Sequence, residues 1–134
     1  MSDQMETQKQ RAAAWCHELR NQIVDACEGL EDSHTKGPFS DQPAGRFEVT
    51  KTKRASADGS DAGGGLMSVM RGGRVFEKVG VNISTVYGEL GTRAQAAMAA
   101  RKGIPGMKDD PRFWASGISL VAHMQNPQCP AVHM

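Results

Sequence analysis

The chain has 134 residues, which is enough for one domain with a hydrophobic core and too few for two. Its 16 Lys and Arg side chains nearly balance its 15 Asp and Glu side chains, so the composition gives no argument for binding to nucleic acid or to a membrane surface. No apolar run approaches the length of a membrane span, and the polar N-terminus lacks the apolar region of a secretory signal.

The N-terminal part, residues 1–31, is predicted to form one amphipathic helix from about residue 4 to residue 31. Apolar side chains recur there at steps of three and four residues, which places them in a single stripe along the helix. The members of this stripe are Trp15, Leu19, Ile23, Ala26 and Leu30. Such a stripe is typical of a helix that packs on a core.

The three cysteines are Cys16, Cys27 and Cys129, and no CxxC motif is present. An odd number without that motif indicates free thiols in a reducing compartment, so we expect a cytoplasmic protein. Cys16 and Cys27 lie beside the helix stripe and are interpreted as small packing residues. Cys129 lies near two prolines, and without a neighbouring base it is a weak candidate for a nucleophile.

Residues 32–65 are predicted to contain a linker, a short strand and a Gly-rich loop. The linker ends near Gly45, and residues 46–53 alternate as a strand with Phe47 and Val49 inward. Basic side chains on this strand are typical of a protected sheet edge: Lys51, Lys53 and Arg54. Residues 55–65 are rich in Gly, Ser and Asp, which predicts a mobile loop.

Residues 66–134 are predicted to contain a hairpin, a short helix and a strand that carries the candidate site. In the hairpin, residues 66–70 pair with residues 75–79 across the two-residue turn Gly72-Gly73. The second arm continues to Tyr87. Apolar side chains alternate along it on one face, which leaves Lys78, Gly80, Asn82 and Ser84 on a face available to a ligand.

A basic cluster lies near this turn and consists of Arg71, Arg74 and Lys78. A solvated hairpin tip is the simpler interpretation, and an anion site is the alternative. The neighbouring glycines match neither G-x-x-x-x-G-K-[ST] nor G-x-G-x-x-G, so they do not indicate a phosphate-binding loop.

Residues 92–102 are predicted to form a short Ala-rich helix that Gly103 and Pro105 terminate. Asp109 and Asp110 follow directly before a proline. Paired carboxylates are able to bind a metal or transfer protons, but in a polar Pro-containing segment they are more typical of a turn.

The last stretch, residues 117–133, begins as a strand in which Ser119, Val121 and His123 share one face. Prolines break this strand, and the chain then delivers a second imidazole, His133. Nine residues separate the two histidines, which does not match a zinc-binding helix. The spacing fits two antiparallel strands whose imidazoles meet across the ladder, although two unrelated strand-end histidines are the simpler interpretation of spacing alone.

Two long motifs in this order resemble the oxygen-dependent coproporphyrinogen-III oxidase family. The first is Val75-Phe-Glu-Lys-Val-Gly-Val-Asn-Ile-Ser84, which follows a Gly-Gly-Gly segment and Arg-Gly-Gly-Arg. The second is Gly117-Ile-Ser-Leu-Val-Ala-His123, which Asn126-Pro127 and Pro130-Ala-Val-His133 follow. The resemblance covers residues 15–134.

The resemblance implies a haem-biosynthesis enzyme that oxidatively decarboxylates two propionates of coproporphyrinogen III to vinyl groups. The oxidant is O2, and the products are protoporphyrinogen IX, carbon dioxide and hydrogen peroxide. It also implies an α+β fold, in which helices flank a large antiparallel sheet, and a soluble homodimer without an organic cofactor.

The site roles come from the same resemblance. Ser119 corresponds to a substrate contact and His123 to a metal ligand, while His133 corresponds to both the catalytic proton donor and a second metal ligand. Manganese is the metal linked to some bacterial members. The four carboxylates of such a substrate require cationic partners, and we infer, apart from the resemblance, that Arg71, Arg74 and Lys78 supply some of them.

The family continues with an Asn-x-Arg element directly after the position of His133, and about half of its fold lies beyond that point. We therefore expect residues 1–134 to be a single partial domain, the N-terminal portion of the enzyme, with little or no activity alone. The alternatives are a non-catalytic tetrapyrrole-binding or assembly module and a small metalloprotein with a histidine site.

Overall fold

The computed structural model describes residues 2–101, 106–107 and 109–134. Its elements in chain order are α1 (Asp3–Ser33), β1 (Glu48–Ala55), β2 (Asp61–Arg71), β3 (Phe76–Glu89), α2 (Thr92–Ala99), β4 (Arg112–Met124) and β5 (Val132–His133). In this described part the strands form one antiparallel sheet in the order β1-β2-β3-β4-β5. The predicted α+β class with an antiparallel sheet is confirmed.

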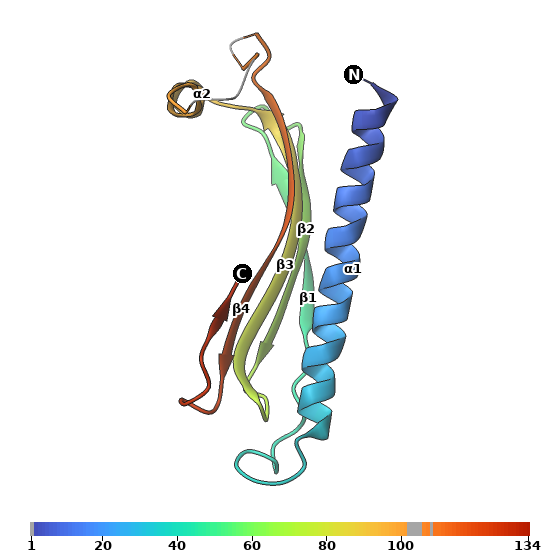
Figure 1. Ribbon diagram of the computed structural model, residues 1–134, viewed down its shortest axis with the longest axis vertical. Coiled ribbons are helices and arrows are strands. Elements are labelled where there is room, and N and C mark those ends of the chain that lie inside the picture. The colour runs from blue at the N-terminus through green and yellow to red at the C-terminus, as the bar shows by residue number, and fades with distance from the viewer. Residues whose placement is uncertain (1, 102–105, 108) are drawn as a thin grey trace.

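The sheet has one covered face and one open face. α1 runs along the convex side of the curved sheet, and α2 lies at one end of the opposite, concave side (Figure 1). Apart from α2 at that end, no described helix lies on the concave side. We call this side the open face. None of the described helices is long and apolar enough to cross a membrane.

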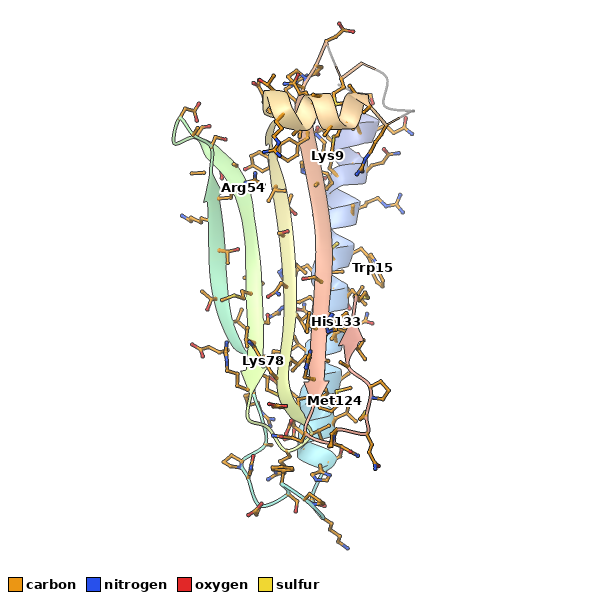
Figure 2. The ribbon with its side chains drawn as sticks, turned by 90° about the vertical axis from the view of Figure 1, so that its left-hand side faces the viewer. Lys9, Trp15, Arg54, Lys78, Met124 and His133 are labelled. Carbon is orange, nitrogen blue, oxygen red and sulfur yellow. The ribbon has the colours of Figure 1, made fainter. Side chains whose placement is uncertain are left out.

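The face of α1 that contacts the sheet contains only part of the predicted stripe: Ile23 packs against the core, but other members are exposed. Trp15 is 57% exposed and Leu30 is 53% exposed, whereas Val24, Cys27 and Glu31 are buried. Trp15 points away to the side, past the β4 edge of the sheet (Figure 2). Apolar periodicity did not predict this face because one of its buried members is a polar residue, Glu31, near the C-terminal end of α1.

The hydrophobic core lies between α1 and strands β2, β3 and β4. Val79 and Val81 of β3 are completely buried, as is Met70 of β2. The other buried members of the cluster are Val24, Cys27, Phe76 and Ala122. The predicted alternation of β3 is therefore confirmed, because its apolar face packs on the helix.

The Gly-rich segment at residues 61–65 is part of a strand, which corrects the predicted loop. β2 begins at Asp61, where Gly64 and Gly65 pair with both β1 and β3, and Gly63 pairs with Val86 of β3. A side chain at Gly65 would collide with the carbonyl oxygen of Ile83. Composition suggested flexibility here, but these glycines permit close approach of neighbouring backbones.

The hairpin between β2 and β3 is present, but its turn lies two residues later than predicted. Met70 pairs with Val79, and Arg71 pairs with Lys78. The N–H of Gly73 donates to the carbonyl oxygen of Phe76, so the turn is centred on residues 74 and 75. The Gly-Gly pair suggested the wrong centre because the carboxylate of Glu31, which is distant in sequence, binds the turn.

The outer strand β1 matches the predicted sheet edge, with a difference in its apolar residues. Phe47 lies just before the strand and packs against the core, as expected. Val49 pairs with the buried Ser68 and so projects from the covered face as predicted, but it is 48% exposed and does not join the core. α2 ends at Ala99 rather than residue 102, and the predicted stop at Gly103 and Pro105 lies outside the described residues.

Candidate functional site

The candidate site lies on the open face, where β3, β4 and β5 present polar side chains. Ser119 of β4 pairs with Asn82 of β3, and His123 pairs with Lys78. Side chains alternate along a strand, so Ser119 and His123 both project from the face opposite to the buried Ala122. Both side chains are exposed. This arrangement matches the strand alternation predicted from the sequence.

β5 brings the second histidine to the same face. His133 pairs with Val121, and the backbones of Met134 and Leu120 exchange two hydrogen bonds of 2.9 Å. The Nε2 atoms of His123 and His133 are 3.4 Å apart, and their ring centroids are 5.6 Å apart. The sequence prediction that the imidazoles meet across antiparallel strands is confirmed, and the interpretation as unrelated histidines is wrong.

The loop between the two histidines is held by short-range and cross-sheet contacts. The backbone N–H of Gln125 donates to the carbonyl oxygen of Val75. The side-chain amide of Gln125 donates to the carbonyl oxygen of Gly73. The side-chain oxygen of Asn126 accepts the N–H of Gln128. These contacts tie the loop to the β2–β3 turn, so the same turn that Glu31 fixes also supports the return to His133.

The spacing of the imidazoles fits shared coordination of one ion. With metal–nitrogen bonds of about 2.0–2.1 Å, a separation of 3.4 Å corresponds to an angle of about 110° at the metal, which is close to tetrahedral. Within residues 2–101, 106–107 and 109–134, no group of three or more His, Cys, Asp or Glu side chains has metal-binding geometry. The pair therefore offers two ligands, and further ligands would have to come from water, substrate or additional protein.

A row of basic side chains crosses the open face beside the histidines. Arg71 pairs with Lys78, and Lys78 pairs with His123, which places the three on one line across β2, β3 and β4. Arg71, Lys78 and His123 are all exposed. Exposed basic side chains fit both a solvated hairpin tip and an anion site, so both interpretations stay open.

Arg74 does not belong to this row, which corrects its predicted role as a partner for substrate. Its Nε donates to the carbonyl oxygen of Gln42 at 2.6 Å, and its Nη1 donates to that of Glu31. The side chain therefore binds the linker to the end of α1. Arg71, Arg74 and Lys78 are close in sequence, which suggested one cluster of three cations. The turn instead directs Arg74 away from the open face, toward Gln42 and Glu31.

Asn82 is a polar residue of the open face to which sequence reasoning gave no role. It lies opposite Ser119, and its Oδ1 is buried without a hydrogen-bond partner in the described part of the chain. Buried carbonyl oxygens of this kind are rare in native proteins. The only signal in the sequence was its position on the ligand-accessible face of the strand.

The remaining candidates have structural roles or lie apart from the histidines. Asp110 accepts two hydrogen bonds from the guanidinium of Arg112, and these lower the pKa of Asp110 to about 2. The N–H groups of Asp109 and Asp110 both donate to the carbonyl oxygen of Gly106, which confirms the predicted turn. Cys27 is buried in the core, and burial raises the pKa of its thiol.

These features define an α+β protein whose open sheet face carries paired imidazoles and exposed basic side chains. The sequence profile described as coproporphyrinogen III oxidase matches residues 11–134. The chain belongs to this family.

Curated relatives are similar over most of the chain. The oxygen-dependent coproporphyrinogen-III oxidase of Rickettsia bellii (strain RML369-C) is 42% identical over 121 residues, which cover 90% of this chain and 38% of the relative. The enzyme of the same name from Rickettsia felis is 41% identical over 127 residues, which cover 93% of this chain and 40% of the relative. The chain thus spans about two fifths of the length of these relatives.

Proposed function

We propose that the chain supplies one wall of the substrate pocket of an oxygen-dependent coproporphyrinogen-III oxidase. The observation that carries this proposal is the 3.4 Å approach of His123 and His133 on the open face of a member of this family. In the reaction, each of two propionates loses its carboxylate as CO2 and becomes a vinyl group. One O2 takes up the two electrons released from each propionate, together with protons, and leaves as H2O2.

The residues of the open face suit a substrate with four carboxylates. Lys78 and Arg71 are exposed and free to pair with carboxylates, and Ser119 presents a hydroxyl beside them. His133 acts as the proton donor in this proposal, because an imidazole is able to gain and lose a proton near neutral pH. Its closeness to His123 allows a proton to pass between the two rings.

The proposal includes a divalent metal, with manganese as the first candidate, on Nε2 of His123 and His133. Such an ion would act as a Lewis acid that stabilises negative charge on bound oxygen atoms. An organic cofactor is not part of the proposal. We further propose a homodimer in the cytoplasm as the assembled form, following the expectation for the family.

The 134-residue chain alone is proposed to have little or no oxidase activity. β4 runs from Arg112 to Met124, but β5 pairs with only the part near Val121 and Ala122. The remaining edge of β4 has no neighbouring strand in the described part of the chain, and the open face has no opposite wall there. This chemistry requires a site from which water is excluded. A pocket with a single wall does not exclude water.

An anaerobic titration with coproporphyrinogen III, followed by an aerobic assay for protoporphyrinogen IX, tests the proposal. We expect binding by the unmodified chain and weaker binding by His123→Ala and His133→Ala. The control His17→Ala, at an exposed residue of α1 on the covered side of the sheet, should leave binding unchanged. Absence of binding would contradict the proposed function. Turnover comparable to that of a full-length relative would contradict the proposed inactivity of the chain alone.

The same experiment separates the two alternatives. A non-catalytic tetrapyrrole-binding or assembly module would bind coproporphyrinogen III and also remain without turnover after addition of the other portion of a full-length relative. A small metalloprotein would bind a stoichiometric metal through both histidines and would not bind the macrocycle. Turnover on addition of the remaining portion of a full-length relative would support the oxidase.

A further inference from the structure

The return of the chain to His133 has little support from β5 itself. This strand consists of Val132 and His133, and both residues are exposed. Its register covers two residue pairs, with Val121 and Ala122 of β4. A ladder this short, without a side chain in the core, does not fix a strand firmly. The position of His133 opposite His123 therefore depends on the loop that precedes β5.

The loop between β4 and β5 has one residue that is not exposed. Gln125 is half-buried, whereas residues 126–131 are exposed. Asn126 shapes the loop locally, because its backbone and side-chain oxygen atoms accept the N–H groups of Cys129 and Gln128. Such turn contacts hold the shape of the loop without attaching it to the sheet. The attachment is therefore made by Gln125.

Gln125 binds the β2–β3 turn at two carbonyl groups. Its backbone N–H donates to the carbonyl oxygen of Val75 at 2.8 Å, and its side-chain amide donates to the carbonyl oxygen of Gly73 at 2.9 Å. The loop and the turn lie at the same end of the sheet (Figure 1). These two hydrogen bonds thus join the loop that precedes His133 to the turn that precedes β3.

The carboxylate of Glu31 holds the same turn from the opposite direction. The peptide unit that joins residues 73 and 74 gives its N–H to Glu31 at 2.6 Å and its carbonyl to the side chain of Gln125. The unit that joins residues 75 and 76 gives its N–H to Glu31 at 3.0 Å and its carbonyl to the backbone N–H of Gln125. Two peptide units thus link the buried carboxylate to Gln125. Hydrogen bonds in such chains polarise and strengthen one another.

We propose that Gln125 is a positioning residue for His133, and that Glu31 acts on His133 through the same two peptide units. Gln125 holds the loop, and the loop sets where β5 meets β4. β5 in turn places Nε2 of His133 3.4 Å from Nε2 of His123. This inference rests on the proposed function, because it concerns the histidine pair of that site. Neither Gln125 nor Glu31 belongs to the pair, yet both determine whether it forms.

Gln125→Met tests the positioning role, because methionine has a side chain of similar length but lacks the N–H donor. The first readout is the nuclear Overhauser effect between the imidazole protons of His123 and His133 in the metal-free chain, which should weaken. The second is the Kd for Zn²⁺, which should rise about fivefold, the equivalent of one lost neutral hydrogen bond. Gln125→Lys supplies an N–H donor of similar reach and should restore both readouts.

Two controls separate positioning from stability. Gln128→Met makes the same change at an exposed residue of the same loop, whose side chain makes no hydrogen bond in the described part of the chain. Val24→Ala removes buried methyl groups from the core beneath α1 and lowers stability without touching the loop. Both controls should leave the ring-to-ring effect and the Kd for Zn²⁺ unchanged in the folded chain.

Glu31→Gln tests the link through the turn, and Glu31→Asp takes its place if the glutamine variant does not fold. Either should weaken the ring-to-ring effect. Combined with Gln125→Met, it should raise the Kd no further than the larger single effect, because both substitutions break one route. Effects that multiply would overturn the shared route.

An unchanged ring-to-ring effect in Gln125→Met would overturn the positioning role, as would a Kd for Zn²⁺ within about twofold of that of the unmodified chain. Absence of binding of both Zn²⁺ and coproporphyrinogen III by the unmodified chain would contradict the proposed function. The ring-to-ring effect needs neither ligand, so it decides the positioning role in that case as well.

Discussion

The carboxylate of Glu31 accepts a hydrogen bond of 2.6 Å from the backbone N–H of Arg74, although 43 residues separate them in the chain. The same carboxylate accepts the N–H groups of Gly45, Val75 and Phe76 at 3.0–3.2 Å. One completely buried anion thus joins the end of α1, the linker and the β2–β3 turn. This junction sets the position of the turn and hence the register that brings Lys78 beside the site.

Glu31→Gln should destabilise the fold by about 3 kcal/mol, because the amide cannot accept all four N–H groups and brings its own NH2 against them. Urea unfolding at pH 7 measures the free energy of unfolding. Glu18→Gln on the exposed side of α1 is the matched control and should change this free energy by less than about 0.5 kcal/mol. Equal effects of the two substitutions would contradict the role of Glu31.

Stability should fall in acid through the same carboxyl group. Burial alone would raise the pKa of Glu31, but the N–H groups of Phe76, Gly45, Arg74 and Val75 together hold it below the ordinary value of 4.5. The folded-state pKa is therefore below the unfolded-state pKa, so the stabilisation is complete above about pH 4.5 and is lost as the pH falls through the folded-state pKa.

The measurement for this pH dependence is the free energy of unfolding of the wild type and Glu31→Gln between pH 7 and pH 3. The difference between them should shrink as the pH falls, because protonation removes the anion in the wild type. A difference that stays constant with pH would show that the charge of Glu31 does not contribute.

Two glycine substitutions in the same sheet should have opposite effects on stability. Gly65→Ala should destabilise the fold by more than about 2 kcal/mol, because its Cβ would collide with the carbonyl oxygen of Ile83 in the adjacent strand. Gly117→Ala should stabilise it by about 0.5 kcal/mol, because its Cβ enters open space. Chemical denaturation measures both, and a stabilising Gly65→Ala would contradict the close pairing of β2 with β3.

The histidine pair should bind one divalent ion per chain. Zn²⁺ is a suitable probe because it binds imidazole nitrogen strongly, and calorimetry gives its stoichiometry and affinity. His123→Ala and His133→Ala should each weaken binding at least about tenfold, since either substitution leaves a single imidazole. His17→Ala should bind as the wild type does, and equal loss in that control would indicate non-specific binding.

Much of this architecture is predictable from local patterns. The alternation along β3 and β4 is simple, so the sequence places Ser119 and His123 on one face. Prolines between the two histidines force a return of the chain, which makes the pairing of His133 with the β4 strand a reasonable expectation. Roles for these residues, in contrast, came from resemblance to the family.

These errors share one physical cause, which is that contacts between residues distant in the sequence override local patterns. The apolar stripe through Trp15 suggested the wrong helix face because Arg20 donates to the buried hydroxyl of Ser68, and Glu31 binds the turn. The glycines at residues 61–65 suggested a loop. They instead lie in a strand, where the absence of a side chain lets the neighbouring strand backbones pair closely. Local patterns in the sequence do not predict these long-range contacts.

The most direct test of the central claim, that the open face carries the tetrapyrrole, is a search for intermolecular nuclear Overhauser effects between bound coproporphyrin III and side-chain methyl groups. Val121 and Met67 lie on the open face and are 43% and 42% exposed, whereas Val79 and Val81 are buried beneath α1. We predict effects between the macrocycle protons and the methyl groups of Val121. Effects confined to residues of α1, or none with any open-face residue in a saturated complex, would contradict the account.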